Sequence, residues 1–411
     1  MENILTYWFY LEPYTFIFRS ENKFVLYNTL NSSYIEAPAS QSVTDMMNLL
    51  DDASNGYCIV LTEEQIKEPA FHQFAMKVRD TFSGDLVESE SDTKKPFIFK
   101  PVLFLNTDIR KAKEEDFSFL GERVLENLNE VSVYLPGKCN KKCKDCKSYH
   151  KQMLHCTQFE DIPMTVSNYL SLLLELNSSG VNKVNILGSD LTENEYLADL
   201  YPTLSGCKFK KVFYVDFVSF TDKCIEWLKD DTSMLCITVH TGYDQNELET
   251  QMNRWGSYNI LWNFVVTSDV DLNNCEALNI PVSAQTGLIP YYNGSNLQFF
   301  RENIFSSIED IIAEPVSKKT IFRRQALNEN FFGKLTLLPS GEIYANLNCS
   351  PIGKYPFDSL KKIVFKELTG STAWFLPRDQ EPCASCVNKY LCPSISNYEL
   401  VLGKHNLCLI E

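Results

Sequence analysis

Three cysteines in the stretch "GKCNKKCKDC" are close enough in sequence to bind one metal centre. Cys139, Cys143 and Cys146 are separated by three and then by two residues. In a loop, thiolates at this spacing can converge on one point. Three thiols without a regularly spaced fourth are typical of a four-iron four-sulfur cluster that leaves one iron open to another ligand.

A structural zinc site is the alternative for the same thiols. Zinc in a structural site usually takes four protein ligands, often in paired C-x2-C knuckles. This stretch contains one such pair and one further cysteine, and Cys156, His150 or His155 could supply the fourth ligand. The residue types therefore leave iron-sulfur and zinc open, and the spacing favours iron-sulfur.

A second group of thiols lies near the C-terminal end in "CASCVNKYLC". Its members share a short span of sequence and are Cys383, Cys386, Cys392 and Cys408. They have the number and type of ligands for an iron-sulfur cluster or a four-cysteine zinc site. Six other cysteines are scattered, and we expect them to be small buried hydrophobic residues: Cys58, Cys207, Cys224, Cys236, Cys275 and Cys349.

The composition limits what the rest of the chain can do. With 411 residues, 44% of them hydrophobic, the chain can form two or three domains. Its net charge of -15 argues against a nucleic-acid partner, because such binding depends on clustered Lys and Arg. The start "MENILTYWFYLEP" has neither the basic leader of a signal peptide nor an uninterrupted apolar span. We expect a cytoplasmic protein with no membrane partner and with reduced thiols.

The first cysteines follow an apolar strand in a repeating pattern of strands and helices. The predicted strands are 131–135, 183–187, 211–217, 234–240, 259–266 and 280–286. A helix between the first two would be capped by Thr165 or Ser167 and ended by Gly180. This alternation predicts an α/β fold with a parallel sheet or an open βα barrel. In such folds the functional site lies at the C-terminal ends of the strands.

The two ends of the chain have other patterns. Residues 7–37 alternate apolar and polar positions and predict a three-stranded meander, and helices follow, with Pro69 at a helix start or break. The polar stretch 83–96 predicts a linker. Past residue 330, "FFGKLTLLPSGEIYANL" predicts a hairpin turning at Pro339-Ser340-Gly341.

The cysteine motif after the first strand resembles the C-x3-C-x2-C motif of radical S-adenosylmethionine enzymes. The resemblance implies a cluster that binds S-adenosylmethionine and reductively cleaves it to a 5'-deoxyadenosyl radical. That family usually has Gly-Gly-Glu at the end of the second strand, where this chain has Gly188, Ser189 and Asp190. These three residues are thus implied to bind the cofactor. A second departure is Asp145, which stands where the family usually has an aromatic residue against the adenine.

The C-terminal cysteines resemble those of the SPASM domain, a module of peptide-modifying radical enzymes. The resemblance implies that Cys383, Cys386, Cys392 and Cys408 bind one auxiliary 4Fe-4S cluster. Ser396 stands where the family has a ligand of another auxiliary cluster. The implied metal content is therefore two 4Fe-4S clusters, one binding S-adenosylmethionine and one auxiliary, and four-cysteine zinc remains the alternative at the second site.

The N-terminal strands and helices resemble the small winged-helix module that binds leader peptides in pathways for ribosomally made, modified peptides (RiPPs). Together with the two cysteine motifs, this resembles a SPASM-type radical S-adenosylmethionine peptide maturase. More narrowly, "YWFYLEPYTFIF" and "KQMLHCTQ" are similar to the pseudo-radical-SAM proteins of Bacteroidales peptide-modification systems. A dimerisation or scaffolding role for the N-terminal strands and helices is the alternative.

The fold implied by this resemblance is α/β, a partial (βα)6 barrel of radical SAM type between two smaller modules. The expected division is a winged-helix-like α+β module over 1–90, a linker over 91–128, the barrel over 129–325 and a Cys-rich SPASM-like domain over 326–411. The implied activity is modification of a precursor peptide, by cross-linking or other C–H functionalisation, with a reducing partner. The alternative is a catalytically diverged protein that binds the peptide and presents it to a companion radical SAM enzyme.

Overall fold

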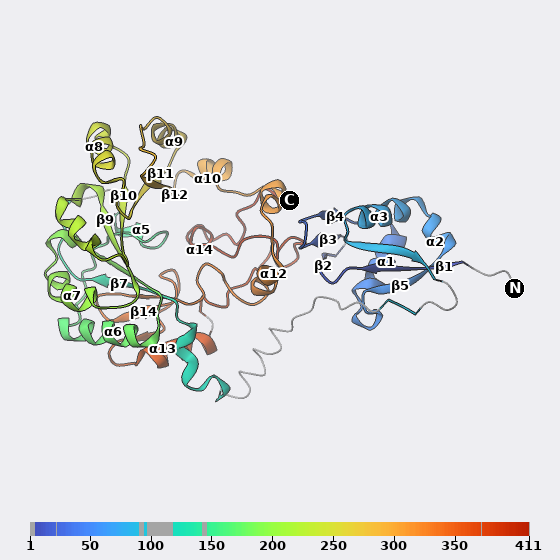
Figure 1. Cartoon of the computed structure of the whole chain (residues 1–411), viewed down its shortest axis with the longest axis horizontal. Coiled ribbons are helices and arrows are strands. Elements are labelled where there is room, and N and C mark those ends of the chain that lie inside the picture. Colours follow the sequence, from blue (N-terminus) through green and yellow to red (C-terminus); the bar gives the residue numbers. More distant parts are fainter. Residues whose placement is uncertain are drawn as a thin grey trace.

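The computed structural model describes residues 5–21, 23–89, 94–96, 118–141, 146–370 and 372–410. The parallel sheet and its helices lie at one end of the molecule and the N-terminal elements at the other, with the C-terminal segment between them (Figure 1). In these ranges every helix is too short or too polar to cross a bilayer. Predicted linker residues 97–117, and Cys143 and Asp145 of the first motif, lie outside the described residues.

Two three-stranded antiparallel sheets form the N-terminal part. The predicted meander is confirmed as the sheet β2-β3-β4, while β1 is the centre of a separate sheet, β5-β1-β6. The strands are β1 (Thr6–Leu11), β2 (Thr15–Arg19), β3 (Phe24–Asn28), β4 (Tyr34–Glu36), β5 (Cys58–Thr62) and β6 (Gly84–Glu88). The helices are α1 (Gln41–Asp51), α2 (Glu63–Lys67) and α3 (Pro69–Asp80), the last beginning at the predicted proline.

The prediction of a linker over 83–96 is wrong in its first part. Gly84–Glu88 form β6, which pairs along its length with β1. Gly84 lies against the carbonyl oxygen of Tyr10, and a Cβ there would be 2.1 Å from that oxygen. Leu86 packs on the hydrophobic core of this part of the chain. The polar composition of the stretch concealed an edge strand that has only a few buried contacts.

Six parallel strands follow one another in chain order across the large sheet. The full order is β12-β11-β10-β9-β8-β7-β13-β14-β15, and β13 pairs parallel with β7 while β14 and β15 are antiparallel. The strands are β7 (Glu130–Leu135), β8 (Lys183–Gly188), β9 (Lys210–Asp216), β10 (Ser233–Val239), β11 (Ile260–Val266), β12 (Gln285–Pro290), β13 (Lys334–Leu337), β14 (Glu342–Tyr344) and β15 (Gly353–Lys354). The predicted α/β class and the hairpin β13–β14 are confirmed.

The last predicted parallel strand is misplaced. We predict it over 280–286, but the structure has a turn there, in which Ala284 N–H donates to Pro281 O, and β12 begins at Gln285. Val282 is fully exposed in this turn. Proline cannot donate to a sheet ladder, so the apolar residues around Pro281 do not continue a central strand.

Helices cover one face of the large sheet. They are α6 (Val166–Ser179), α7 (Glu195–Ser205), α8 (Gln245–Trp255), α9 (Asp269–Glu276) and, after the last parallel strand, α10 (Leu297–Asn303). The predicted caps of α6 are confirmed: Thr165 Oγ1 accepts from Asn168 N–H, and Gly180 ends the helix with φ of +79°. Tyr169, Leu172 and Leu176 of this helix join the largest hydrophobic core with side chains from alternate strand positions.

The loop after β7 fills the other face of the sheet. Leu154 and Phe159 pack against Tyr134, Leu187 and other inward residues of the strands. Short helix α5 (Cys146–Tyr149) lies in this loop, and its Tyr149 packs with Met153 against the ends of β11 and β12. The loop that contains the first cysteines therefore lies at the C-terminal ends of the parallel strands.

The C-terminal segment joins the sheet to the N-terminal part. Its helices are α11 (Ile308–Ala313), α12 (Lys318–Arg324) and α14 (Asn397–Leu402), whereas α13 (Leu360–Gly370) packs into the core of the large sheet. Elsewhere in the chain, 3-10 segments lie at Ser118–Asn127 and Asp222–Lys229. Phe16, Phe18 and Tyr27 of the meander form one hydrophobic cluster with α11, α12 and the residues near Leu391. Tyr27 Oη also accepts from Val316 N–H at 2.8 Å.

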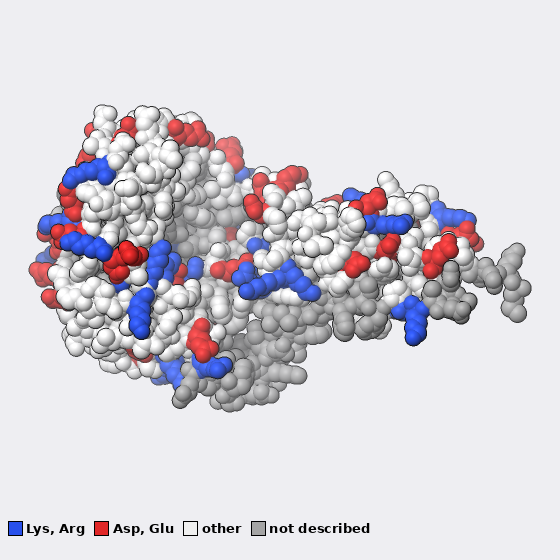
Figure 2. Space-filling view, viewed as in Figure 1, with Lys and Arg blue, Asp and Glu red and all other residues white. Residues whose placement is uncertain are grey.

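Charged side chains of both signs are interspersed over the face drawn in Figure 2. Lys and Arg of the described residues do not gather there into one broad patch. The net charge of -15 arises from 53 acidic against 38 basic residues in the whole chain.

Candidate functional site

One cavity of about 550 Å³ brings the predicted cofactor residues together at the strand ends. Cys139 and Cys146 line it with Ser189 and Asp190. Cys139 follows β7, and its N–H donates to Gln158 Oε1, while Cys146 begins α5. Both thiols are partly exposed. The structure thus brings together four of the six residues predicted for this site.

Gly188 ends β8 and does not line the cavity. Its position requires a glycine because β8 packs closely against the end of β7 there. A Cβ at Gly188 would lie 2.7 Å from the carbonyl oxygen of Leu135, which ends the neighbouring strand β7. The glycine therefore lets two strand ends approach closely just before the turn that carries Ser189 and Asp190.

The Ser189 side chain has room because the residue opposite it, Gly137, has no side chain. A Cβ on Gly137 would be 2.3 Å from Ser189 Oγ. The Ser189 residue is 3% exposed, and its hydroxyl has no hydrogen-bond partner among the described residues. A buried polar atom at a cavity wall without a protein partner indicates a position where a bound ligand would supply the hydrogen bond.

The Asp190 carboxylate already accepts hydrogen bonds from its own loop and from the segment after β9. Oδ1 accepts from the N–H and hydroxyl of Thr192 at 3.1 and 2.6 Å, and Oδ2 accepts from Ser219 Oγ at 3.0 Å. A carboxylate has about four acceptor positions, so about one remains for a ligand. Asp190 is therefore held in place, and its capacity to bind a positively charged group is reduced.

The four C-terminal cysteines line a second cavity of about 230 Å³. Burial raises the pKa of the Cys392 thiol to about 12, and neighbouring Cys386, Cys383 and Cys408 add to the shift while Arg378 opposes it. Four thiols that influence one another in this way form a compact donor set. Because metal binding requires thiolates, an ion or cluster here would displace four protons.

Arg378 fixes the surroundings of this second set. Its guanidinium donates to Pro393 O at 2.6 Å, Glu399 Oε1 at 2.7 Å and His405 O at 2.9 Å, and Nη1 is 3.8 Å from Cys383 Sγ. Cys383 Sγ is itself 3.3 Å from His405 O. Cys349 is not part of the set, since its thiol lies 3.6 Å from Thr372 O.

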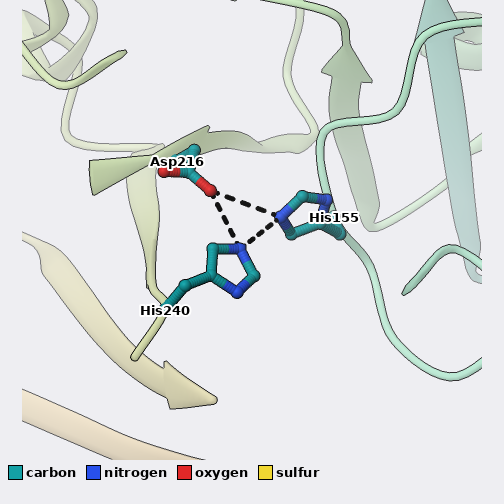
Figure 3. Close-up of side chains that lie close together, drawn as sticks. All are labelled: His155, Asp216 and His240. Atoms are coloured by element: carbon teal, nitrogen blue, oxygen red, sulfur yellow. Dashed lines mark hydrogen bonds and ion pairs between the residues drawn. The ribbon is translucent and has the colours of Figure 1, made fainter. Parts of the chain in front are cut away.

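A group of polar side chains beside the first cavity was not predicted from the sequence. His155, Asp216 and His240 point toward one another at the strand ends (Figure 3). Burial works to raise the pKa of Asp216, but the two imidazoles hold it below its ordinary value. Burial lowers the pKa of the His155 imidazole, and its contact with Asp216 opposes this shift.

A sequence signal for this group existed in the strand pattern. Asp216 and His240 stand at or just after the ends of "KVFYVD" and "MLCITV", at positions of the same parity as the inward-facing Tyr214 and Cys236. His155 was considered only as a ligand for the first cysteines. The loop fold that brings it inward could not be inferred from spacing.

Comparisons with known proteins assign no family to the chain. No protein-family model matches it, and no curated protein matches it. Among solved structures, a crystal structure of Streptococcus suis SuiB bound to precursor peptide SuiA is similar with a TM-score of 0.48 and 13% identity, covering 98% of this chain and 100% of that chain. SuiB bound to S-adenosylmethionine has a TM-score of 0.46 and 13% identity, covering 97% of each chain. At these scores function has to be inferred from the chain's own residues.

Proposed function

We propose that this chain is a radical S-adenosylmethionine peptide maturase that modifies a ribosomally made precursor peptide by cross-linking or other C–H functionalisation. One observation supports this above the others: Cys139 and Cys146 of the three-cysteine motif share a cavity with Ser189 and Asp190. Residues of the cysteine motif after β7 and of the turn after β8 thus lie at one place. The resemblance to that family requires this arrangement.

The described residues fit the proposed cofactors. Cys139 and Cys146, with Cys143 from outside the described residues, would hold a 4Fe-4S cluster, and Ser189 Oγ would give the bound S-adenosylmethionine a hydrogen-bond partner. When bound, the cluster would supply the electron that cleaves S-adenosylmethionine. The chain's own contribution is to hold that cofactor between the β7 loop and the β8 turn.

The two flanking parts have proposed roles of their own. Cys383, Cys386, Cys392 and Cys408 would hold an auxiliary 4Fe-4S cluster, because the four line one cavity. In the sheet β5-β1-β6, both outer strands pair on one side only within the described residues. A leader peptide would add to such an edge as a further strand. We propose this role for residues 1–90, in a cytoplasmic protein that depends on a reducing partner.

A second candidate function is supported by Asp190. In a catalytically diverged protein the fold would bind the precursor peptide and present it to a companion radical SAM enzyme. The Asp190 carboxylate accepts three hydrogen bonds within the chain, which weakens it as a partner for the cofactor's amino group. This observation favours the proposed pseudo-radical-SAM group within the wider family.

The experiment that separates the two is production of 5'-deoxyadenosine. The full chain is reconstituted with iron and sulfide without oxygen, and dithionite and S-adenosylmethionine are added. We expect 5'-deoxyadenosine from the wild type and none from a variant with Cys139, Cys143 and Cys146 changed to Ala. Iron should fall from about eight to about four per chain in that variant. A wild type that holds its iron and forms no 5'-deoxyadenosine would support the peptide-presenting function instead.

A further inference from the structure

Three potential metal ligands converge at the ends of β9 and β10. Nε2 of His155 and Nε2 of His240 are 2.9 Å apart, and Asp216 Oδ2 is 3.5 Å from the first and 2.9 Å from the second. The side chains of His155, Asp216 and His240 are 0%, 4% and 20% exposed. We propose that these three residues bind a divalent transition-metal ion, with zinc as the ion that suits them, at a site separate from both groups of cysteines.

Hydrogen bonding alone leaves this arrangement crowded. A neutral imidazole carries one proton. If both rings carry it on Nε2, both can donate to Asp216 Oδ2, but the two donor nitrogens then lie only 2.9 Å apart. If only one ring carries its proton on Nε2, that single N–H faces two acceptors, the other Nε2 and Asp216 Oδ2. If neither ring does, the lone pairs of both Nε2 atoms and of Asp216 Oδ2 point at one another. One cation satisfies all three atoms in the last case, which is the arrangement in which imidazole binds metal.

The separations between these atoms are close to those of ligands around one ion. Nitrogen and oxygen ligands lie about 2.0–2.2 Å from zinc, so two ligands of one tetrahedral ion are about 3.3–3.6 Å apart. The observed separation of 3.5 Å falls in this range, and the two separations of 2.9 Å are about 0.4 Å shorter, so the ligands need to move apart only slightly when an ion binds. Two imidazoles and a carboxylate are also a donor set that leaves the fourth position of a tetrahedral zinc site open.

The surrounding structure holds the ligands in these positions. Asp216 and His240 come from neighbouring parallel strands, and Asp216 Oδ1 accepts from Val218 N–H at 3.0 Å, which leaves Oδ2 for the site. The Tyr149 ring centroid lies 4.8 Å from that of His155 and 4.7 Å from that of His240. Nδ1 of each imidazole is buried without a partner among the described residues. The ion itself would therefore select the tautomer.

The site stands between two cavities. Asp216 lines both the cavity of about 550 Å³ with the first cysteines and a neighbouring one of about 580 Å³ that His240 also lines. An ion held here would have its open coordination position within reach of a ligand in either cavity. The proposal depends only on these residues and stands whether or not the chain cleaves S-adenosylmethionine.

Metal content of matched variants tests the proposal. The full chain is first loaded with iron and sulfide to occupy the cysteines, equilibrated with Zn²⁺, freed of unbound metal and analysed for zinc and iron. We expect about one zinc per chain in the wild type and almost none in Asp216→Asn and His240→Gln. His150→Gln is the control, because His150 lies in the same loop outside the cluster, and it should keep the zinc.

X-ray absorption at the zinc edge identifies the ligands, and nitrogen and oxygen neighbours are expected. Unchanged zinc in both variants, or mainly sulfur neighbours, would overturn the proposal. Iron content and circular dichroism equal to the wild type show that each variant is folded. If Asp216→Asn fails this check, His240→Gln decides the question, because His240 is the most exposed of the three side chains.

Discussion

Replacing Arg378 with Met should locally destabilise the segment that contains the C-terminal cysteines. The Glu399 side chain is 2% exposed and that of Arg378 is 11% exposed, and the two are joined at 2.7 Å. Removing one partner of a buried ion pair leaves the other charge unpaired and costs about 3–5 kcal/mol. The carbonyl oxygens of Pro393 and His405 lose their hydrogen-bond donors as well. We therefore expect a loss of stability at the upper end of this range.

Native-state hydrogen exchange of peptides from residues 372–410 measures this loss where it arises. A cost of about 4 kcal/mol corresponds to about a thousandfold faster exchange of the protected amides. The double variant Arg378→Met with Glu399→Gln should lose less than the sum of the single variants, because both charges are then absent. Retention of iron or zinc by the four thiols, measured on the same samples, should fall together with protection, because Arg378 also contacts Cys383.

The matched control is Lys362→Met, which removes an ion pair of the same part of the chain. Lys362 is 2.7 Å from Asp358, but its side chain is 60% exposed. Exposed pairs contribute about 0–1 kcal/mol, so exchange should hardly change. If Arg378→Met is no more destabilised than Lys362→Met, the reasoning about the buried pair is refuted.

Three further predictions concern single positions. Gly188→Ala should lower the melting temperature, at a cost of about 1–3 kcal/mol, and weaken calorimetric binding of S-adenosylmethionine, the proposed cofactor, because its Cβ meets Leu135 O. Gly341→Ala should cost about 2–4 kcal/mol in urea unfolding, since φ is +87° and the new Cβ would be 2.2 Å from Tyr355 O. Burial lowers the pKa of His150 to about 4, and the unfolded chain binds that proton near pH 6.5. Its contribution to stability is therefore complete above about pH 6.5 and is lost as the pH falls toward 4, and urea midpoints of wild type and His150→Asn should converge over that interval.

Periodicity predicted the first five parallel strands well because each is a largely apolar run that is mostly buried, whereas the misplaced β12 is largely exposed. The helix cap at Thr165, the break at Pro69 and the turn at Gly341 were predictable because each is decided by local backbone chemistry. Strand β6 was missed since its partner β1 lies more than seventy residues earlier and its two apolar residues stand in a stretch that is otherwise polar. No local pattern encodes a pairing over that distance.

The first cysteine motif could be singled out in the sequence because ligand spacing within one loop is a local property. The grouping of His155 with Asp216 and His240 was not, because it depends on the loop after β7 turning back under the sheet. That turn is held by Gln152, whose side chain donates to Tyr292 O at 2.8 Å and accepts from Tyr292 N–H at 2.9 Å. These long-range contacts form only in the folded chain.

One loop provides residues to both proposed sites at the strand ends, and this limits how independently the two sites can behave. Cys146 begins α5 and His155 follows it, and Tyr149 between them packs at a tilt against both imidazoles. The two hydrogen bonds of Gln152 with Tyr292 hold this part of the loop beside the end of β12. A change that frees this loop removes a ligand from each site at once, so the effects of Gln152→Ala and of a single ligand substitution should not add. The first cysteines and the His155 cluster are therefore coupled through the folding of one loop, even though no side chain need belong to both.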